Sequence, residues 1–208
     1  MTAEAAATAP TKRKRQPSPA TPDFSILLVC RANLCRSPMA EFLARRELAA
    51  RDLPVRVSSA GTHAVVDTPL HRFARESLMS MQIDPAGFLS RPITEGIVAN
   101  SSVILTMTDA QRSWIVSTFP EAVRKTYLLT QFSRLVAATP DPGAVPASDW
   151  GPSLLSRAVE GRSLAQPLVN GRDIGDPIGR SLRHFQNCAK TLEERIMPLF
   201  AGTTIEHG

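Results

Sequence analysis

The sequence predicts a three-layer, doubly wound α/β fold built on a four-stranded parallel sheet. Short apolar segments alternate along the chain with longer segments whose apolar residues recur at helical spacing. Strands that alternate with helices form parallel sheets with helices on both faces. In addition, a cluster of chemically active residues follows the first apolar segment, at the edge of the sheet where ligands bind in such folds.

Four short segments are predicted to form this sheet. The first covers about 25–30 and is almost entirely apolar, as expected of a strand buried on both faces. The second, at 55–58, alternates apolar and polar residues. The third is expected at 102–107 and the fourth at 126–129. The intervals between them are long enough for helical connections.

Helical patterns occupy those intervals. The first helix is signalled by Ser37, a common N-cap residue, and Pro38, which is favoured in a first helical turn. A long last helix is signalled by apolar residues at helical spacing from Leu182 to Leu199. The predicted helices cover 37–51, 69–81, 93–100, 109–119 and 178–199.

The domain organisation is predicted from composition. A length of 208 residues with 43% hydrophobic content suits one α/β domain with a sizeable core. Residues 1–23 are rich in Ala, Thr, Pro and Ser around the basic cluster Lys12–Arg15, so we expect a disordered basic tail. The folded domain is expected at 24–202, followed by a C-terminal tail at 203–208.

One part of the predicted domain has an unusual composition. Five prolines punctuate residues 137–171, with a short helical pattern at 153–159. We interpret this stretch as a Pro-rich surface insertion. The alternative is a lid or docking element beside the functional site, because the stretch leads directly toward Asp176.

Charge and cysteine content limit the location and the partners of the protein. No apolar run approaches the ~20 residues of a membrane span, and no apolar stretch near the N-terminus resembles a signal peptide. Three cysteines are too few for a disulfide framework, so a cytoplasmic location is expected.

The net charge of +5 favours anionic substrates. The four basic residues of the cluster Lys12–Arg15 have no interleaved aromatic residues, so they make a poor nucleic-acid site. No nucleic acid is therefore expected as a partner.

The most informative segment is residues 29–38, VCRANLCRSP. It places Cys30 at the carboxyl end of a buried strand and Arg36 where a helix begins. The backbone N–H groups of residues 31–36 can turn inward, and the helix start adds its positive dipole end, which together predict an anion-binding loop. The same field stabilises a thiolate, and Arg36 can hold two phosphate oxygens. This arrangement is typical of phosphate monoester hydrolysis through a phosphocysteine.

Three later segments complete a recognisable pattern. They are SSAGT at 58–62, VILTMT at 103–108 and DIGDP at 173–177. Together with VCRANLCRSPMAE they resemble, in order, the motifs of the bacterial low-molecular-weight protein tyrosine phosphatases, except near 137–171. The resemblance implies a flavodoxin-like fold and hydrolysis of phosphotyrosine in proteins, with no cofactor and no metal. It also suggests a tyrosine kinase as partner, in some relatives one that controls exopolysaccharide export.

The resemblance assigns a role to each site residue. Cys30 is the nucleophile, Arg36 binds the phosphoryl group, and Asp176 is the general acid and then the base. Pro177 fixes the backbone after Asp176, and Asp173 is the second candidate for the acid. The remaining phosphate-binding positions are Arg31, Ala32, Asn33, Leu34, Cys35 and Ser37.

Several of these residues are expected to support the loop. Asn33 tolerates a left-handed backbone, and the family pairs this residue with Ser59. Ser37 can donate to the thiolate or cap the helix. Cys35 is either a small buried residue or the partner of Cys30 in a reversible disulfide, as in many relatives. The third cysteine, Cys188, is expected in the core.

The sequence also departs from the family pattern. Ala32 replaces a glycine, which is tolerable unless the position needs a positive φ. Arg31 occupies a rim position that is apolar in many members, and Phe88 falls where some members carry a supporting histidine. Ile178 and Gly179 replace tyrosines that flank the substrate ring, so aromatic contact with the substrate should be weaker.

Three other functions compete with phosphotyrosine hydrolysis. A thioredoxin-coupled arsenate reductase would need a cysteine pair near 105–115, where none occurs. A protein-arginine phosphatase remains an alternative, although such relatives tend to carry Thr where this chain has Leu34. A catalytically silent phosphate-binding module need not keep Asp176. The sequence leaves the physiological substrate and the oligomeric state open.

Overall fold

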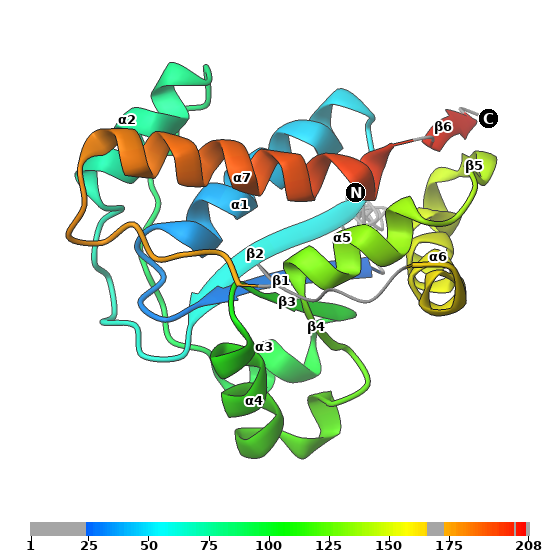
Figure 1. The fold of residues 1–208 in the computed structure, drawn as a ribbon, viewed down its shortest axis with the longest axis horizontal. Helices are drawn as coiled ribbons and strands as arrows, with labels where there is room; N and C mark the ends of the chain where they lie inside the picture. Colours follow the sequence, from blue (N-terminus) through cyan, green and yellow to red (C-terminus); the bar gives the residue numbers. More distant parts are fainter. Residues whose placement is uncertain (1–23, 166–172, 202, 207–208) are drawn as a thin grey trace, which may run out of the picture.

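The computed structural model describes residues 24–165, 173–201 and 203–206 (Figure 1). The predicted tail at 1–23 and the end of the predicted insertion, at 166–172, lie outside these residues.

The centre of the fold is a four-stranded parallel sheet, which confirms the predicted fold class. Its strands are β1 (Phe24–Cys30), β2 (Val55–Gly61), β3 (Val103–Thr106) and β4 (Thr126–Leu128). Their order is β2-β1-β3-β4, so the chain leaves β1 toward one edge and returns to build the other. The carboxyl end of β1 lies at this topological switch point, where ligands bind in open α/β sheets.

The central strand is β1, and all seven of its residues are buried. It pairs along its length with β2, from Phe24 opposite Val55 to Cys30 opposite Gly61. On its other side it pairs with β3. This burial explains why the strand reads as an apolar run in the sequence and why Cys30 ends it at the sheet edge.

Helices cover both faces of the sheet (Figure 1). One face carries α1 (Arg36–Ala50), α2 (Arg72–Ser80), α5 (Leu129–Ala137) and α7 (Leu182–Phe200), and the other carries α3 (Glu95–Ala99) and α4 (Asp109–Thr118). Side chains of β1 alternate between these layers, because successive strand residues point to opposite faces. Ile26 and Leu28 join the larger core, whereas Leu27 and Val29 join the smaller one under α3 and α4.

The boundaries of several predicted elements are wrong by a few residues. The last helix begins at Leu182 rather than at 178, because the chain first turns with the Arg180 N–H donating to the Pro177 carbonyl (3.0 Å). The helix predicted at 69–81 is shorter, and the second strand continues to Gly61. The first helix begins at Arg36, and the Ser37 hydroxyl does not cap it.

The region after β4 differs most from expectation. Helix α5 was not predicted, and the short helix expected at 153–159 is the 15-residue α6 (Trp150–Leu164). The predicted C-terminal tail contains β6 (Thr203–Glu206), which pairs in parallel with β5 (Gly143–Pro146). These elements form through contacts with distant parts of the chain, which periodicity alone does not reveal.

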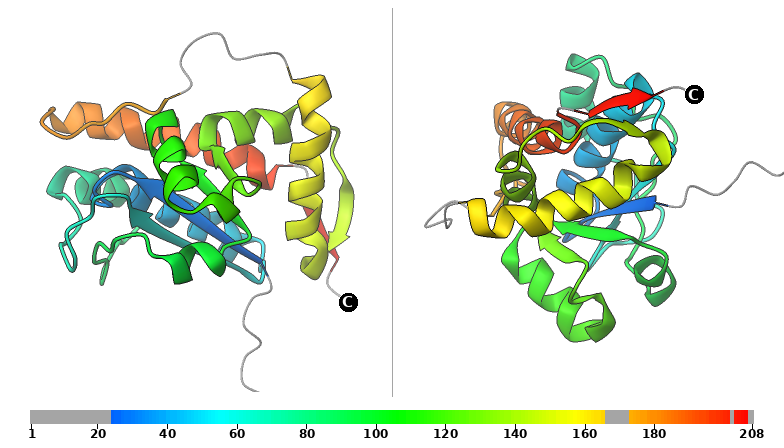
Figure 2. Two further views of the ribbon diagram at one scale, coloured as in Figure 1. Left: turned by 90° about the horizontal axis from the view of Figure 1, so that it is seen from below. Right: turned by 90° about the vertical axis from the view of Figure 1, so that its right-hand side faces the viewer.

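Helix α6 packs into the body of the domain. Trp150 is buried, with its ring edge-on to Phe24 (6.1 Å between centroids) and stacked on Phe200 (5.3 Å). Because Phe24 begins β1, α6 lies at the end of the sheet opposite Cys30 (Figure 2). The described part of the 137–171 segment thus packs, through Trp150, against the start of β1 and the end of α7.

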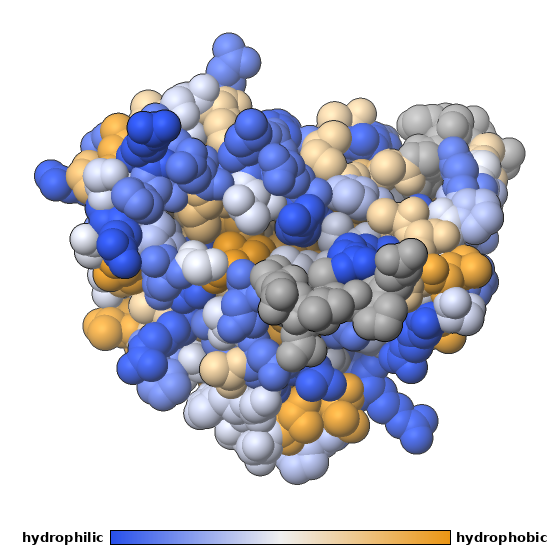
Figure 3. Space-filling view, viewed as in Figure 1, coloured by the Kyte–Doolittle hydropathy of each residue, from blue (hydrophilic) through white to orange (hydrophobic). Residues whose placement is uncertain are grey.

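No helix in the described part of the chain is long and apolar enough to span a membrane. On the face shown in Figure 3, hydrophobic residues lie in separate patches among hydrophilic ones.

Candidate active site

Cys30 lies at the base of the loop that joins β1 to α1. It is 2% exposed, and its Sγ accepts hydrogen bonds from the Ser37 hydroxyl (3.0 Å) and from the Asn33 backbone N–H (3.3 Å). Hydrogen bonds that point at a sulfur atom favour its charged form. Ser37 thus acts on the thiol rather than capping the helix.

The loop backbone forms a cradle above this sulfur. Asn33 has a left-handed backbone with φ of 55°, whereas Ala32 does not need a positive φ, so alanine is accommodated where relatives have glycine. Within the described chain, the backbone N–H groups of residues 31, 32, 34 and 35 donate to no acceptor. Such a row of unpaired N–H groups at a helix start is suited to an anion.

The Asn33 side chain holds the loop in this shape. Its Nδ2 donates to the hydroxyls of Ser37 (3.0 Å) and Ser59 (2.8 Å), and its Oδ1 accepts from the Arg91 backbone N–H (3.0 Å). The Ser59 hydroxyl in turn donates to the buried carboxylate of Glu41 (2.5 Å). A continuous series of hydrogen bonds therefore runs from Cys30 to Glu41.

Glu41 and Arg91 are site residues that the sequence reasoning missed. Burial raises the pKa of Glu41, although the Ser59 hydrogen bond and the charges of Arg45 and Arg91 oppose this shift. Glu41 is the glutamate that ends the VCRANLCRSPMAE segment, so the signal for it was present. Phe88, in the position of the supporting histidine, packs against Phe42 instead (6.1 Å between centroids).

Gly61 allows β2 to approach the loop closely. A Cβ atom built at this position would lie 2.7 Å from the Arg31 carbonyl oxygen and 2.9 Å from the Asn33 nitrogen, both backbone atoms. The next residues continue the contact, because the Thr62 N–H donates to the Cys30 carbonyl (3.0 Å) and the His63 N–H donates to the Arg31 carbonyl (2.8 Å). The glycine is thus required by close packing.

Arg36 reaches from the start of α1 to the loop before α7. It is 4% exposed; its Nη1 donates to the Ile174 carbonyl (2.9 Å) and its Nη2 to the Asp176 carboxylate (2.5 Å). The buried Nε has no acceptor among the described residues. An unpaired, buried guanidinium N–H is costly unless a ligand accepts its hydrogen bond.

The two acidic candidates of this loop have different surroundings. Asp173 accepts a hydrogen bond from the Asp109 N–H at the start of α4 (2.9 Å), which gives it a structural partner away from Cys30. Asp176 pairs with Arg36, and its side chain is 39% exposed. The Ile174 N–H also donates to the Met107 carbonyl after β3 (2.8 Å), which fixes the loop to the sheet. The geometry thus favours Asp176 as the group nearer the cradle.

The three cysteines are free thiols in the structure. Burial, followed by the neighbouring charge of Cys30, raises the pKa of Cys35 far above its usual range. Burial likewise raises the pKa of Cys188, to about 12, and this residue lies in the core. The two buried thiols therefore remain protonated, and the disulfide between Cys30 and Cys35 stays a prediction.

The rim of the cradle combines charged and apolar residues. Arg31 is exposed, Leu34 is half-buried, and Ile178 is 46% exposed. The rings of His63 and Trp114 lie 5.8 Å apart. Among the described residues, no group of three or more His, Cys, Asp or Glu side chains is placed to hold a metal ion.

His71 links the cradle to the helices above the sheet. Its backbone N–H donates to the Leu34 carbonyl (3.0 Å), and its ring Nδ1 accepts from the Phe73 backbone N–H (3.2 Å). Its ring stacks on the ring of Phe185 (4.6 Å between centroids). Burial and then the charge of Arg72 lower its pKa. The folded protein therefore favours neutral His71, with Nδ1 as an acceptor.

A pH-dependent stability is expected from this histidine. Between its lowered pKa and the ordinary value of about 6.5, the unfolded chain binds a proton that the folded chain does not, so stability falls as pH falls through this window. His71→Asn keeps a side-chain acceptor for the Phe73 N–H but does not titrate. Thermal unfolding at pH 7.5 and pH 5.5 should show a larger loss for wild type than for this variant. Equal losses would contradict the expectation.

Comparison with known proteins connects this geometry to a family. The family profile described as low molecular weight phosphotyrosine protein phosphatase matches residues 25–145, which include the sheet and Cys30 but end before Asp176. The phosphatase Etp of Escherichia coli K12 is 33% identical over 108 residues, covering 52% of this chain and 70% of that protein. The probable phosphatase EpsP of Ralstonia nicotianae is 30% identical over 136 residues, covering 65% of this chain and 91% of that protein.

Solved structures give the same fold. The arginine phosphatase YwlE of Geobacillus stearothermophilus superposes with a TM-score of 0.64 at 29% identity, covering 85% of this chain and 90% of its own.

Proposed function

Because the chain belongs to the low molecular weight phosphotyrosine protein phosphatase family, and is thus a phosphoric monoester hydrolase, we propose that it dephosphorylates phosphotyrosine through a phosphocysteine on Cys30. One observation supports the proposal: Cys30 begins a loop in which, among the described residues, several backbone N–H groups and the buried Nε of Arg36 have no acceptor. A phosphoryl group in this cradle would meet a nucleophile and hydrogen-bond donors together.

In the first half of the reaction, the Cys30 thiolate attacks phosphorus. The S–P bond forms while the bond from phosphorus to the tyrosine oxygen breaks, and protonated Asp176 gives its proton to that oxygen. The cradle N–H groups and Arg36 stabilise the charge on the remaining phosphoryl oxygens. The hydrogen bonds from Ser37 and Asn33 stabilise the sulfur as a thiolate.

In the second half, water releases the phosphate. Asp176, now a carboxylate, takes a proton from the attacking water, whose oxygen bonds to phosphorus as the S–P bond breaks. Inorganic phosphate leaves, Cys30 returns as a thiolate and Asp176 is again protonated. Proton and electron pairs balance over the cycle, and no other reactant is required.

The pair formed by Arg36 and Asp176 fits a resting state. A guanidinium stabilises the carboxylate form, but the first half-reaction needs a protonated acid. A phosphate dianion that binds Arg36 competes with Asp176 for the same donor. Binding of substrate would thereby release Asp176 from Arg36.

The phosphoamino acid is the point to test, because the relatives include tyrosine and arginine phosphatases. Leu34 is a half-buried apolar residue of the cradle loop, and an apolar residue at this position favours a phenyl ring over a guanidinium group. With matched phosphotyrosine and phosphoarginine peptides, we expect kcat/KM to be at least about tenfold higher for phosphotyrosine. Leu34→Thr should reduce that preference. A preference for phosphoarginine would overturn the substrate assignment, and hydrolysis of neither peptide would overturn the proposed activity.

We further propose a cytoplasmic location and a bacterial tyrosine kinase as partner. Three free thiols suit a reducing compartment. The kinase proposal rests on the resemblance to bacterial tyrosine phosphatases such as Etp and EpsP. Loss of kinase dephosphorylation in a strain that carries Cys30→Ser would support it.

A further inference from the structure

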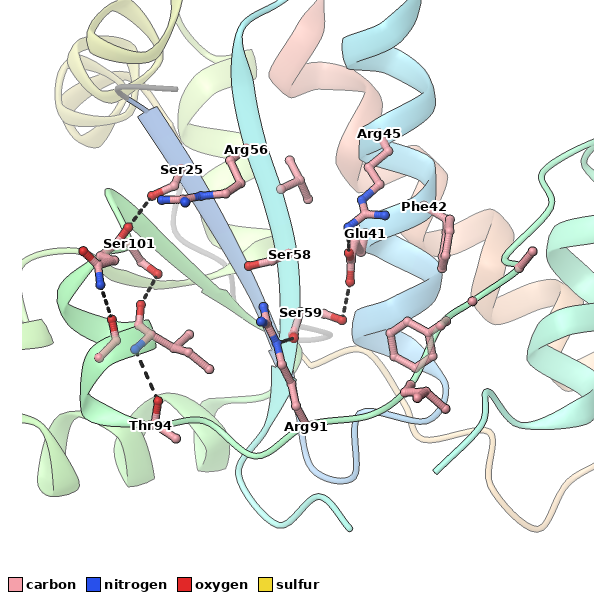
Figure 4. A pocket seen from close by; sticks show the side chains of 18 residues that line it. Ser25, Glu41, Phe42, Arg45, Arg56, Ser58, Ser59, Arg91, Thr94 and Ser101 are labelled. Atoms are coloured by element: carbon pink, nitrogen blue, oxygen red, sulfur yellow. Dashed lines mark hydrogen bonds and ion pairs between the residues drawn. The ribbon is translucent and has the colours of Figure 1, made fainter. Parts of the chain in front are cut away.

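The residues around the cradle fall into two groups. Glu41, Ser59 and Arg91 line a recess of about 840 Å³ beside β2, and they belong to the hydrogen-bonded support of the loop (Figure 4). The second group is His63 and Trp114, whose side chains make no hydrogen bond to the cradle in the described structure. Support of the loop therefore does not account for these two rings.

The backbone places His63 directly beside the cradle. Its N–H donates to the Arg31 carbonyl (2.8 Å), and the preceding Thr62 N–H donates to the Cys30 carbonyl (3.0 Å). His63 is exposed, and its Nδ1 lies 2.9 Å from the Thr62 hydroxyl oxygen. This contact restricts the rotation of the imidazole ring at the rim of the cradle.

Trp114 stands next to this imidazole on α4. The centroids of the two rings are 5.8 Å apart, and the Trp114 ring also lies edge-on to Phe119 (6.2 Å), both within the range of favourable aromatic pairs. Helix α4 begins at the acid loop, since the Asp109 N–H donates to the Asp173 carboxylate (2.9 Å). Trp114 follows about 7.5 Å further along the helix axis. The two rings thus form an aromatic pair that extends from the cradle to α4.

The surface of Trp114 is only partly used within the domain. Trp114 is half-buried, whereas the other tryptophan of the chain, Trp150, is 2% exposed in the core. The Trp114 indole N–H has no acceptor in the described chain, and it is not among the buried unpaired groups there, so it is open to solvent. A half-exposed tryptophan is typical of binding surfaces, where the ring packs on apolar groups and the N–H finds an acceptor.

We propose that His63 and Trp114 form a subsite for an apolar side chain next to the phosphotyrosine of the substrate protein. The subsite depends on the proposed function, because a phosphotyrosine that fills the cradle leaves its own backbone at the rim, where its neighbours must lie. The apolar side chain would pack on the two rings, and the indole N–H would donate to a backbone carbonyl of the same segment. The competing interpretation is that Trp114 only covers the smaller core together with Phe119.

Peptide selectivity of the full-length enzyme tests this subsite. Two pairs of phosphotyrosine peptides carry leucine or serine, one pair immediately before the phosphotyrosine and the other immediately after it. For one of these pairs, wild type should favour leucine about tenfold in kcat/KM, through KM rather than kcat. Trp114→Ala and His63→Ala should each lower this preference to about threefold or less, whereas Trp114→Phe, which keeps a ring, should retain most of it.

A matched control is His184→Ala. His184 is also exposed, and its Nδ1 also lies 2.9 Å from a hydroxyl oxygen, that of Ser181, but it lies on α7 and should not affect the preference. Binding without turnover is followed in Cys30→Ser, where the leucine peptide should change the tryptophan fluorescence. Adding Trp114→Phe to Cys30→Ser should remove this signal.

Circular dichroism verifies that each variant is folded, and if Trp114→Ala does not fold, His63→Ala decides. The subsite is overturned if wild type does not distinguish leucine from serine in either pair. It is also overturned if the folded alanine variants keep the preference, or if His184→Ala loses it equally. Hydrolysis of none of the peptides would instead overturn the proposed function, and the subsite with it.

Discussion

Cys30→Ser is expected to lower kcat for para-nitrophenyl phosphate by a factor on the order of 10⁴ or more. The serine hydroxyl is far less acidic than a thiol, and neither of the described partners of position 30 would activate it as a base, because the Ser37 hydroxyl and the Asn33 N–H both donate to this position. Hydrolysis should be measured under reducing conditions with a chelator. Inorganic phosphate should still bind the variant, because the cradle N–H groups and Arg36 are unchanged.

The matched control for this substitution is Cys188→Ser. Cys188 is also buried but lies in the core on α7, so its replacement should leave kcat close to that of wild type. A Cys30→Ser enzyme that keeps a tenth or more of the activity would contradict the phosphocysteine mechanism. Loss of wild-type activity on chelation would also contradict it.

Asp176→Ala should lower kcat for a phosphotyrosine peptide by about 10²–10³-fold, because no other group in the site would protonate the tyrosine oxygen. The effect on para-nitrophenyl phosphate should be smaller, since nitrophenolate is a weaker base and a better leaving group. KM should fall as well, because Arg36 loses its carboxylate partner and is free to bind phosphate. This combined fall of kcat and KM separates a chemical role from simple loss of structure.

Asp173→Ala is the comparison for the acid assignment. Asp173 bonds the first N–H of α4, so its loss should cost about 0.5–2 kcal/mol of stability, as for a helix cap, and leave the leaving-group dependence unchanged. If Asp173→Ala produced the kcat loss and Asp176→Ala did not, the acid would be Asp173.

Much of the site could be predicted because its central part is contiguous. The loop from Cys30 to Ser37 takes its shape from neighbouring residues: a left-handed Asn33, a buried strand before it and a helix after it. The apolar run of β1 and the alternation of strands with helices predicted the parallel sheet for a similar reason, since each reflects a local period. The resemblance to a family then placed Asp176 before the last helix.

Other features depended on long-range packing. Helix α5, the full length of α6 and the pairing of β5 with β6 are stabilised by contacts such as Trp150 with Phe24 and Phe200, which no local period records. The same holds for Glu41, whose part in the site depends on Ser59 reaching it from a neighbouring strand.

The sequence by itself determined the fold class and predicted the anion-binding loop and the nucleophile, because these follow from local periodicity and from eight consecutive residues. Only the tertiary structure decided which hydroxyl contacts the thiol and which aspartate meets Arg36. Those outcomes depend on groups up to 140 positions apart, as Arg36 and Asp176 are. Such contacts exist only after the sheet has brought the ends of its strands together.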